Sequence, residues 1–288
     1  MDQAETLRRL AAQKPKVAEP KADQDIRIIA VTSGKGGVGK SNVTLNTAIA
    51  LAKRGHATLI LDADMGTANI DILLGMDPRL NLGHVIEGKA SLFEILVKIS
   101  DNLYLLPGAS GIMDPGYLGI QNLEQLRKDI GQLESMFQYV FIDTAAGVNQ
   151  MVIQALKGSD RVLLICNDEP TSIVDAYALV KVLYKQDPEA FIQLVVNDVA
   201  GEEEAEDVYG KLRAAIQHFL KRDLDYLNHI AHDDVIARGV ILQKPFMFTA
   251  AESPARGHVE ALAEKLESTL ADRGGKGLLQ LFQRLIQP

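Results

Sequence analysis

Eight consecutive residues near the start of the chain have the types and the spacing of a phosphate-binding loop. They follow the apolar run Ile26–Val31, and they are Gly34, Lys35, Gly36, Gly37, Val38, Gly39, Lys40 and Ser41. Between a strand and a helix, this G-x-x-x-x-G-K-[ST] pattern predicts backbone N–H groups that cradle a polyphosphate. We expect Lys40 to contact the β- and γ-phosphates of a nucleotide and the Ser41 hydroxyl to bind Mg²⁺.

Lys35 is a second lysine inside the same loop. One loop has little use for two lysines on the same phosphates, and a lysine at its outer edge can instead reach a nucleotide that a second subunit holds. Phosphoryl transfer depends on positioning and on charge stabilisation. Because no arginine finger is evident, Lys35 is the leading candidate for the extra positive charge.

Two aspartate motifs complement the loop, and each ends a strand-like apolar run. Asp62 and Asp64 follow the run that starts at Thr58, and Asp143 ends the run that starts at Tyr139. An aspartate that closes a buried strand beside the loop can hold the water shell of Mg²⁺. We expect that role for Asp143, a supporting role in the metal shell for Asp62, and orientation of the attacking water for Asp64. The competing interpretation is that Asp143 or Asp64 instead caps a helix or a loop.

The segments that must position these residues alternate between strand-like and helix-like patterns. The expected strands are Ile26–Thr32, Thr58–Asp62, Leu103–Pro107, Tyr139–Asp143, Arg161–Cys166, Ile192–Asn197 and Tyr226–Ile230. The expected helices are Asn42–Lys53, Leu123–Met136, Gln150–Lys157, Ser172–Lys185, Glu202–Leu220, Val235–Gln243 and Pro254–Leu270. Strands such as VLLIC and YVFID are apolar on both faces, which is typical of a parallel sheet covered by helices. The sequence therefore predicts an α/β fold with a mostly parallel, twisted sheet flanked by helices, and ligands beyond the carboxyl ends of the strands.

Composition limits the classes of function. The chain has 288 residues with 47% hydrophobic content, ample for a packed core, and a net charge of −8, which argues against broad binding to nucleic acid. Cys166 is the single cysteine, so no intrachain disulfide can form, which fits a reducing compartment. The charged N-terminus predicts no signal peptide, and no apolar run reaches the length of a transmembrane helix.

Two segments flank the expected domain of residues 26–272. Residues 1–25 begin with the helix-like Asp2–Ala12 and continue into a linker with prolines and lysines, so this helix is expected to be tethered; a disordered tail is the alternative. Residues 273–288 begin with a glycine-rich break, and Leu278–Ile286 has its apolar residues on one helical face. We expect this helix to bind a membrane surface reversibly. The alternative is that the same face packs on the body as a last helix.

The loop and the aspartate motifs together resemble the MinD/ParA family of dimerising ATPases. Lys35 with the following G-G-V-G-K-S resembles the deviant Walker A motif of that family, and D-x-D and D-x-x-x-G motifs follow in the same order. The resemblance covers Ile26 to about Leu270 and implies a P-loop NTPase fold of the deviant Walker A type, with ATP and Mg²⁺ as cofactors. It also implies a slow, regulatory ATPase that forms a homodimer with ATP, in which Lys35 crosses the interface.

The same resemblance implies further site residues. Asn42 continues the loop among the nucleotide-binding residues, and Asn46 matches an asparagine near the attacking water in relatives. Glu169 matches a glutamate that can reach the partner's nucleotide. Asn197 matches an adenine-reading asparagine, and Pro245 lies where relatives place a residue that packs on the base.

Within the family, the details look most like the flagellar-number regulators of the FlhG/FleN type. The helix DQAETLRRL at Asp2–Leu10 looks like their partner-binding element, both switch sequences look like that branch, and the amphipathic tail is shared with MinD. The resemblance implies stimulation of a flagellar signal-recognition-type GTPase through Asp2–Leu10 and inhibition of an AAA+ transcriptional activator of flagellar genes. It further implies a cytoplasmic protein that binds reversibly through Leu278–Ile286 to the inner face of the cell membrane, at the pole. One departure is Ala231, where many relatives have a proline after the isoleucine.

Four alternatives use related chemistry. A cell-division MinD is disfavoured by the N-terminal helix and linker, and a ParA-type DNA-partitioning ATPase by the net charge of −8 and the lack of a basic C-terminal stripe; no direct contact with nucleic acid is expected. An iron–sulfur carrier of the same fold needs clustered cysteines, which one Cys166 does not provide. A metabolic kinase needs a substrate pocket, and the sequence shows no pattern for one.

Overall fold

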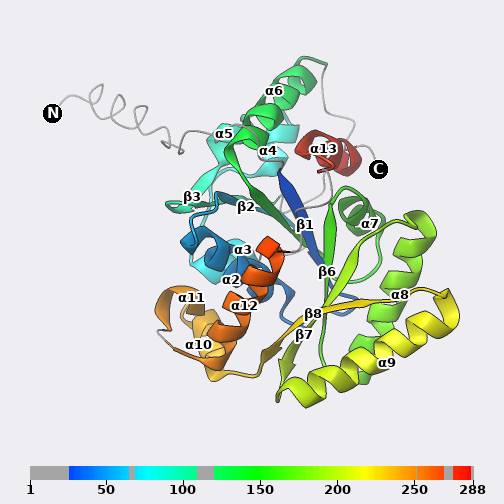
Figure 1. Cartoon of the computed structure of the whole chain (residues 1–288). Coiled ribbons are helices and arrows are strands. Elements are labelled where there is room, and N and C mark those ends of the chain that lie inside the picture. The colour runs from blue at the N-terminus through cyan, green and yellow to red at the C-terminus, as the bar shows by residue number, and fades with distance from the viewer. Residues whose placement is uncertain (1–25, 65–68, 109–119, 251, 269–274, 287–288) are drawn as a thin grey trace.

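The computed structural model describes residues 26–64, 69–108, 120–250, 252–268 and 275–286. Among these residues a sheet of eight strands runs in the order β3-β4-β2-β5-β1-β6-β7-β8 (Figure 1). The strands are β1 (Arg27–Thr32), β2 (Thr58–Ala63), β3 (Val97–Ser100), β4 (Leu103–Leu106), β5 (Tyr139–Thr144), β6 (Arg161–Cys166), β7 (Ile192–Val199) and β8 (Asp225–Ala231). All neighbouring strands are parallel except β3 and β4. The prediction of a mostly parallel α/β sheet is confirmed.

Helices cover both faces of this sheet (Figure 1). They are α2 (Lys40–Lys53), α3 (Ile70–Leu74), α4 (Leu82–Ile86), α5 (Leu92–Ile95), α6 (Ile120–Met136), α7 (Gln150–Lys157), α8 (Pro170–Gln186), α9 (Glu202–Leu220), α10 (Asp234–Ile241), α11 (Phe246–Thr249), α12 (Pro254–Ser268) and α13 (Leu278–Ile286). No helix in the described ranges is long and apolar enough to cross a membrane.

The central strand β1 shows why two layers of helices form. Its apolar side chains alternate between the faces, so that Ile28 and Ala30 join one core and Ile29 and Val31 join the other. The first core contains residues of α6, α7, α8, α9 and α13, and the second contains residues of α2 and α12. Burial on both faces fixes the strand register, since a shift by one residue would exchange the two sets.

The expected strands are all present, with ends that differ by one or two residues. The sequence reading missed β3, because its four residues are only partly buried and include the exposed Lys98. It also missed the short helices α3, α4, α5 and α11. Helices of four or five residues carry too few apolar positions to show a helical period.

The C-terminal helix α13 packs on the body in this structure, as the alternative interpretation of the tail predicted. Leu278, Leu281 and Phe282 are buried in the same core as residues of α6 and α7. Gly158, at the end of α7, allows this close approach, because a Cβ there would lie 2.8 Å from a methyl group of Leu281. The carboxylate of Glu134 accepts the backbone N–H of Leu278 at 3.1 Å. Membrane binding through this face therefore requires α13 to leave its site.

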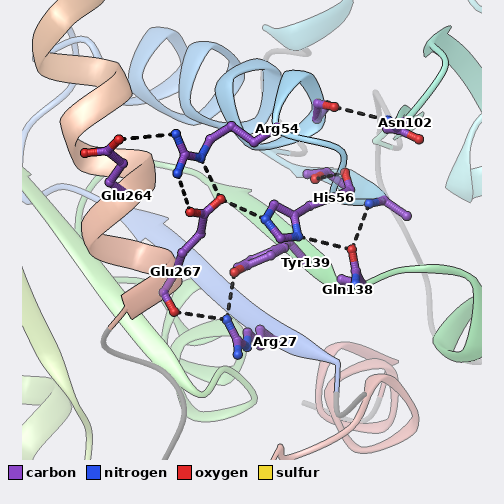
Figure 2. A network of polar contacts seen from close by, with 11 residues as sticks. Arg27, Arg54, His56, Asn102, Gln138, Tyr139, Glu264 and Glu267 are labelled. Carbon is purple, nitrogen blue, oxygen red and sulfur yellow. Dashed lines mark hydrogen bonds and ion pairs between the residues drawn. The ribbon is translucent and has the colours of Figure 1, made fainter. Parts of the chain in front are cut away.

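A polar network joins the end of the P-loop helix α2 to the end of α12 at the amino edge of the sheet (Figure 2). Arg54 donates to both carboxylate oxygens of Glu267, at 2.7 and 2.6 Å, and His56 Nε2 lies 2.7 Å from the same carboxylate. Arg27, the first residue of β1, donates to the Tyr139 hydroxyl at 2.7 Å. The network anchors α2 at the end opposite the phosphate-binding loop.

Candidate nucleotide-binding site

A pocket of about 540 Å³ opens where the carboxyl ends of β1, β2 and β5 meet. Its lining combines the phosphate-binding loop, both aspartate-containing loops and apolar residues of α3 and α10, and consists of Ser33, Gly36, Gly37, Gly39, Lys40, Ser41, Asn42, Asp64, Asn69, Ile72, Leu73, Ala146 and Val240. Parallel α/β sheets place their ligands at this edge. The volume is that of a small-molecule or cofactor site.

The backbone of the loop depends on glycine at two tight points. Gly39 has φ +86° and precedes α2, and a Cβ there would lie 2.3 Å from Nδ2 of Asn197. Gly34 faces the backbone of Asp175 in α8, where a Cβ would lie 2.2 Å from the carbonyl carbon. The backbone contact at Gly34 leaves no room for a side chain, and the left-handed φ of Gly39 favours glycine there. Helix α2 begins directly after the loop, so that its N-terminal N–H groups face the pocket.

Lys40 and Asp143 form a buried ion pair at the floor of the pocket. Lys40 Nζ lies 2.9 Å from Asp143 Oδ1, and the two side chains are 8% and 0% exposed. Thr44, one turn further along α2, donates to the same oxygen at 3.1 Å. Asp143 Oδ2 is buried without a hydrogen-bond partner among the described residues. Lys40 Nζ also lies 3.4 Å from Ser41 Oγ. A buried carboxylate oxygen with free lone pairs, linked to the Ser41 hydroxyl through Lys40, fits the water shell of a bound Mg²⁺.

Asp62 lies directly beside Asp143, because the two residues are paired in the register of β2 and β5. Its carboxylate accepts the backbone N–H groups of Asp64, Asn69 and Ile70, at 3.1, 3.2 and 3.3 Å. Burial, and then the charge of Asp143, raise the pKa of Asp62 to about 7, against the effect of these three N–H donors. Asp62 thus caps the start of α3, which the sequence did not predict, while its carboxylate lies next to the expected metal position.

Asp64 lies in the pocket lining one residue after β2. Nδ2 of Asn69 donates to Asp64 Oδ2 at 3.2 Å, which restricts the direction of this carboxylate. Met65 and Gly66, the rest of the first switch sequence, lie outside the described residues. The geometry is compatible with a carboxylate that accepts a proton from a water molecule in the pocket.

Lys35 is held by its own chain at the rim of the site. Its ammonium donates to the Glu169 carboxylate and, at 2.9 Å, to Thr171 Oγ1. Hydrogen bonds from Lys35, and then from Asn167, hold the pKa of Glu169 below its usual value. Neither Lys35 nor Glu169 lines the pocket, so the structure brings these two residues together beside the site rather than inside it.

Three residues expected at the nucleotide have other contacts here. Asn197 Nδ2 donates to the carbonyl of Val38 at 2.9 Å, so this side chain supports the loop from beneath. Pro245 is buried at the start of α11 and is absent from the pocket lining. Asn46 is fully buried and contacts α11, so the structure does not place it near an attacking water.

The second switch sequence is tied to the loop through its backbone. Gly147 has φ +83° and donates its N–H to the carbonyl of Ser33 at 2.9 Å. Thr144 Oγ1 donates to the carbonyl of Val31 at 3.0 Å.

Some residues of the site were not predicted from the sequence. They are Thr44, Asn69 and the apolar lining residues Ile72, Leu73 and Val240. Thr44 had a signal, because it lies four residues after Lys40 on the same helix face.

The fold and the site define a P-loop nucleotide-binding protein of the α/β class. A family model described as an AAA domain matches residues 26–190. The antiactivator FleN of Pseudomonas aeruginosa is 34% identical over 263 residues, which cover 91% of this chain and 94% of that protein. The chain therefore belongs to the MinD/ParA family of ATPases.

Further relatives agree with this assignment. The flagellum site-determining protein YlxH of Helicobacter pylori is 34% identical over 267 residues, covering 91% of this chain and 90% of that protein. Among solved structures, the septum site-determining protein MinD with Mg-ADP from Pyrococcus horikoshii superposes with a TM-score of 0.66 at 26% identity, covering 84% of this chain and 96% of that chain. A chain of the MinC:MinD cell division protein complex from Aquifex aeolicus gives a TM-score of 0.67 at 25% identity, covering 86% of this chain and 100% of that chain.

Proposed function

We propose that this protein is an ATP-dependent dimerising switch ATPase that regulates flagellar number. The observation that carries the proposal is the arrangement of Lys40, Asp143 and Asp64 around one pocket that is framed by the phosphate-binding loop. Relatives at 34% identity across most of both chains are named an antiactivator and a flagellum site-determining protein, which supports the flagellar assignment.

The site residues divide the chemistry among them. Lys40 would bind the β- and γ-phosphates, and Asp143, Ser41 and the neighbouring Asp62 would hold the water shell of Mg²⁺. The metal ion would supply charge neutralisation at the phosphates. Asp64, held by Asn69, orients the attacking water and accepts its proton. Gly147 links the second switch to the loop, so a change at the γ-phosphate position moves both.

A second subunit completes each site in this proposal. Lys35 is 32% exposed in its side chain and Glu169 is 52% exposed, so their ion pair can exchange with new partners at little cost in free energy. In the dimer, Lys35 contacts the nucleotide of the partner and supplies the extra positive charge. Glu169 is then released toward the nucleotide on the other side of the interface.

The output of the dimer is contact with proteins and with a membrane. Asp2–Leu10, which lies outside the described residues, engages a flagellar signal-recognition-type GTPase and stimulates it. The dimer also inhibits an AAA+ transcriptional activator, in line with the name of the Pseudomonas relative. Two copies of Leu278–Ile286 released together bind a membrane surface more tightly than one, because the second contact is intramolecular.

The test is a pull-down with the GTPase and the activator as separate baits, in ATP and in ADP. The proposal predicts capture of the activator in ATP only, and stimulation of the GTPase that disappears when residues 1–12 are deleted. The same deletion should leave ATP hydrolysis unchanged, which controls for folding. Capture of neither bait in ATP, or stimulation that survives the deletion, would contradict the proposal.

A further inference from the structure

Asn46 links the P-loop helix α2 to the short helix α11. Its Oδ1 accepts the backbone N–H of Met247 at 3.2 Å, and its Nδ2 donates to the carbonyl of Asn42 at 2.9 Å. Asn46 and Met247 are both fully buried. Because both ends of the amide are used in these contacts, Asn46 has a defined orientation that faces α11.

A second residue of α2 binds the other backbone group of the same residue, Met247. Lys53 donates through Nζ to the carbonyl of Met247, and its ammonium lies 5.7 Å from the centre of the Phe248 ring. Burial, and then the charge of Arg256, lower the pKa of Lys53. Helix α2 therefore binds both the N–H and the C=O of Met247. These two hydrogen bonds fix the position of α11 relative to α2.

Helix α11 is in turn joined closely to α10, which forms part of the pocket. Lys244 donates its backbone N–H to the carbonyl of Gly239 at 2.9 Å. A Cβ at Gly239 would lie 2.9 Å from the carbonyl oxygen of Lys244, so only glycine permits this packing. The next residue, Val240, lines the pocket together with Ile72 and Leu73 of α3.

We propose that Asn46 and Lys53 are positioning residues. They act through Met247 to hold helices α10 and α11, here called the α10–α11 wall of the pocket, at a fixed distance from the phosphate-binding loop. They set the affinity for the nucleotide and take no part in activating water. The inference rests on the proposed function, since it deepens the role of the same pocket. It assigns Asn46 the positioning of α11, whereas the family resemblance implied a place near the attacking water. The two roles predict different effects on KM and kcat.

The experiment measures ATP hydrolysis and the binding of a fluorescent ATP analogue to the full chain. Asn46→Leu removes the acceptor for Met247 N–H at similar volume, and Lys53→Met removes the donor to its carbonyl. Each variant should raise KM and the dissociation constant about tenfold, with kcat within about twofold of the unchanged protein. If Asn46 positions the water instead, Asn46→Leu lowers kcat about a hundredfold at unchanged KM, which overturns the proposal. Unchanged KM and unchanged kcat overturn it as well.

A variant in α10 separates the proposed effect from a folding defect in α2. Gly239→Ala leaves Asn46 and Lys53 in place but pushes α10 from α11, so it should raise KM in the same way, whereas an unchanged KM counts against the proposal. Asn102→Ala is the matched control, because it removes a different contact at the same end of α2 as Lys53, the 3.2 Å hydrogen bond from Asn102 to the carbonyl of Ala52 (Figure 2). Its KM should not change. If the unchanged protein neither binds the analogue nor hydrolyses ATP, the proposed function itself fails, which is a separate result.

Discussion

Lys35 and Glu169 form an ion pair within one chain, and Thr171 Oγ1 accepts a second hydrogen bond from the same ammonium at 2.9 Å. Lys35 therefore already has hydrogen-bond partners within its own chain in the monomer. Both members of the pair are exposed to water, and such pairs contribute little to stability. A partner subunit that offers phosphate oxygens to Lys35 can replace this contact, because hydrogen bonds between charged groups in a closed site are stronger.

Replacing Lys35 should separate nucleotide binding from dimer formation. Lys35→Ala leaves Lys40 and the loop backbone intact, so we expect the affinity for ATP to stay within about threefold while ATP-dependent dimers disappear. Size-exclusion chromatography with light scattering, in ATP and in ADP, measures the outcome. Thr171→Ala is the control, since it removes only one contact of Lys35 inside the chain and should still dimerise. Lys35→Ala dimers that persist in ATP would refute the role across the interface.

Removing the carboxylate of Asp64 should block hydrolysis after ATP has bound. We expect Asp64→Ala to lower kcat about 10²–10⁴-fold and to accumulate an ATP-bound dimer, because the attacking water loses its proton acceptor. Asn69→Ala, which removes the 3.2 Å hydrogen bond to Asp64 Oδ2 and leaves the Asp64 carboxylate in place, should reduce kcat by less. Single-turnover hydrolysis with quantified bound nucleotide provides the measurement. Normal turnover by Asp64→Ala would show that another group activates the water.

The buried ion pair of Lys40 and Asp143 should contribute to the stability of the fold as well as to ATP binding. Lys40→Ala should abolish ATP binding and lower the free energy of unfolding by about 2 kcal/mol, because a buried carboxylate loses its cation. Adding Asp143→Asn should restore much of that stability without restoring ATP binding, since the uncompensated charge is gone. Urea denaturation with parallel nucleotide titrations tests both. Equal stability of the single and double variants would contradict the argument.

The sequence predicts the loop, the aspartates and the parallel sheet because each of these depends on local patterns. Asp143 follows four buried apolar residues, and the G-x-x-x-x-G-K-S motif lies between a strand and a helix. The pairing of Lys35 with Glu169 could not be read in this way, because 134 positions separate them. The contact of Asn46 could not be predicted for the same reason. Its partner, Met247, is 201 positions away and bonds through its backbone N–H, which does not depend on the residue type.

The network at the end of α2 should make stability depend on pH (Figure 2). Hydrogen bonds from Arg54 hold the pKa of Glu267 below its usual value of 4.5, so Glu267 contributes stability above that pH and loses the contribution as the pH falls through the lowered pKa. Glu267→Gln should therefore cost about 1 kcal/mol at pH 7, and the difference should shrink as the pH drops below 4.5. Urea unfolding across this range measures it. Glu264→Gln, which loses one exposed contact at 3.3 Å, should cost less; a pH-independent gap for Glu267→Gln would contradict the assignment.

The docked state of α13 should compete with membrane binding, and Gly158 allows the competition to be tested without altering the helix. Gly158→Val places a side chain where Leu281 now packs, so α13 should undock and co-sedimentation of the full chain with anionic lipid vesicles should rise several-fold. Leu281→Ala, on the helix itself, weakens docking and lipid contact together and should not produce this rise. Gly257→Val is a control for the added side chain, because a Cβ at Gly257 meets no atom within 4 Å. If Gly158→Val folds normally and sediments no more than the unchanged protein, the apolar face of α13 serves only to complete the core.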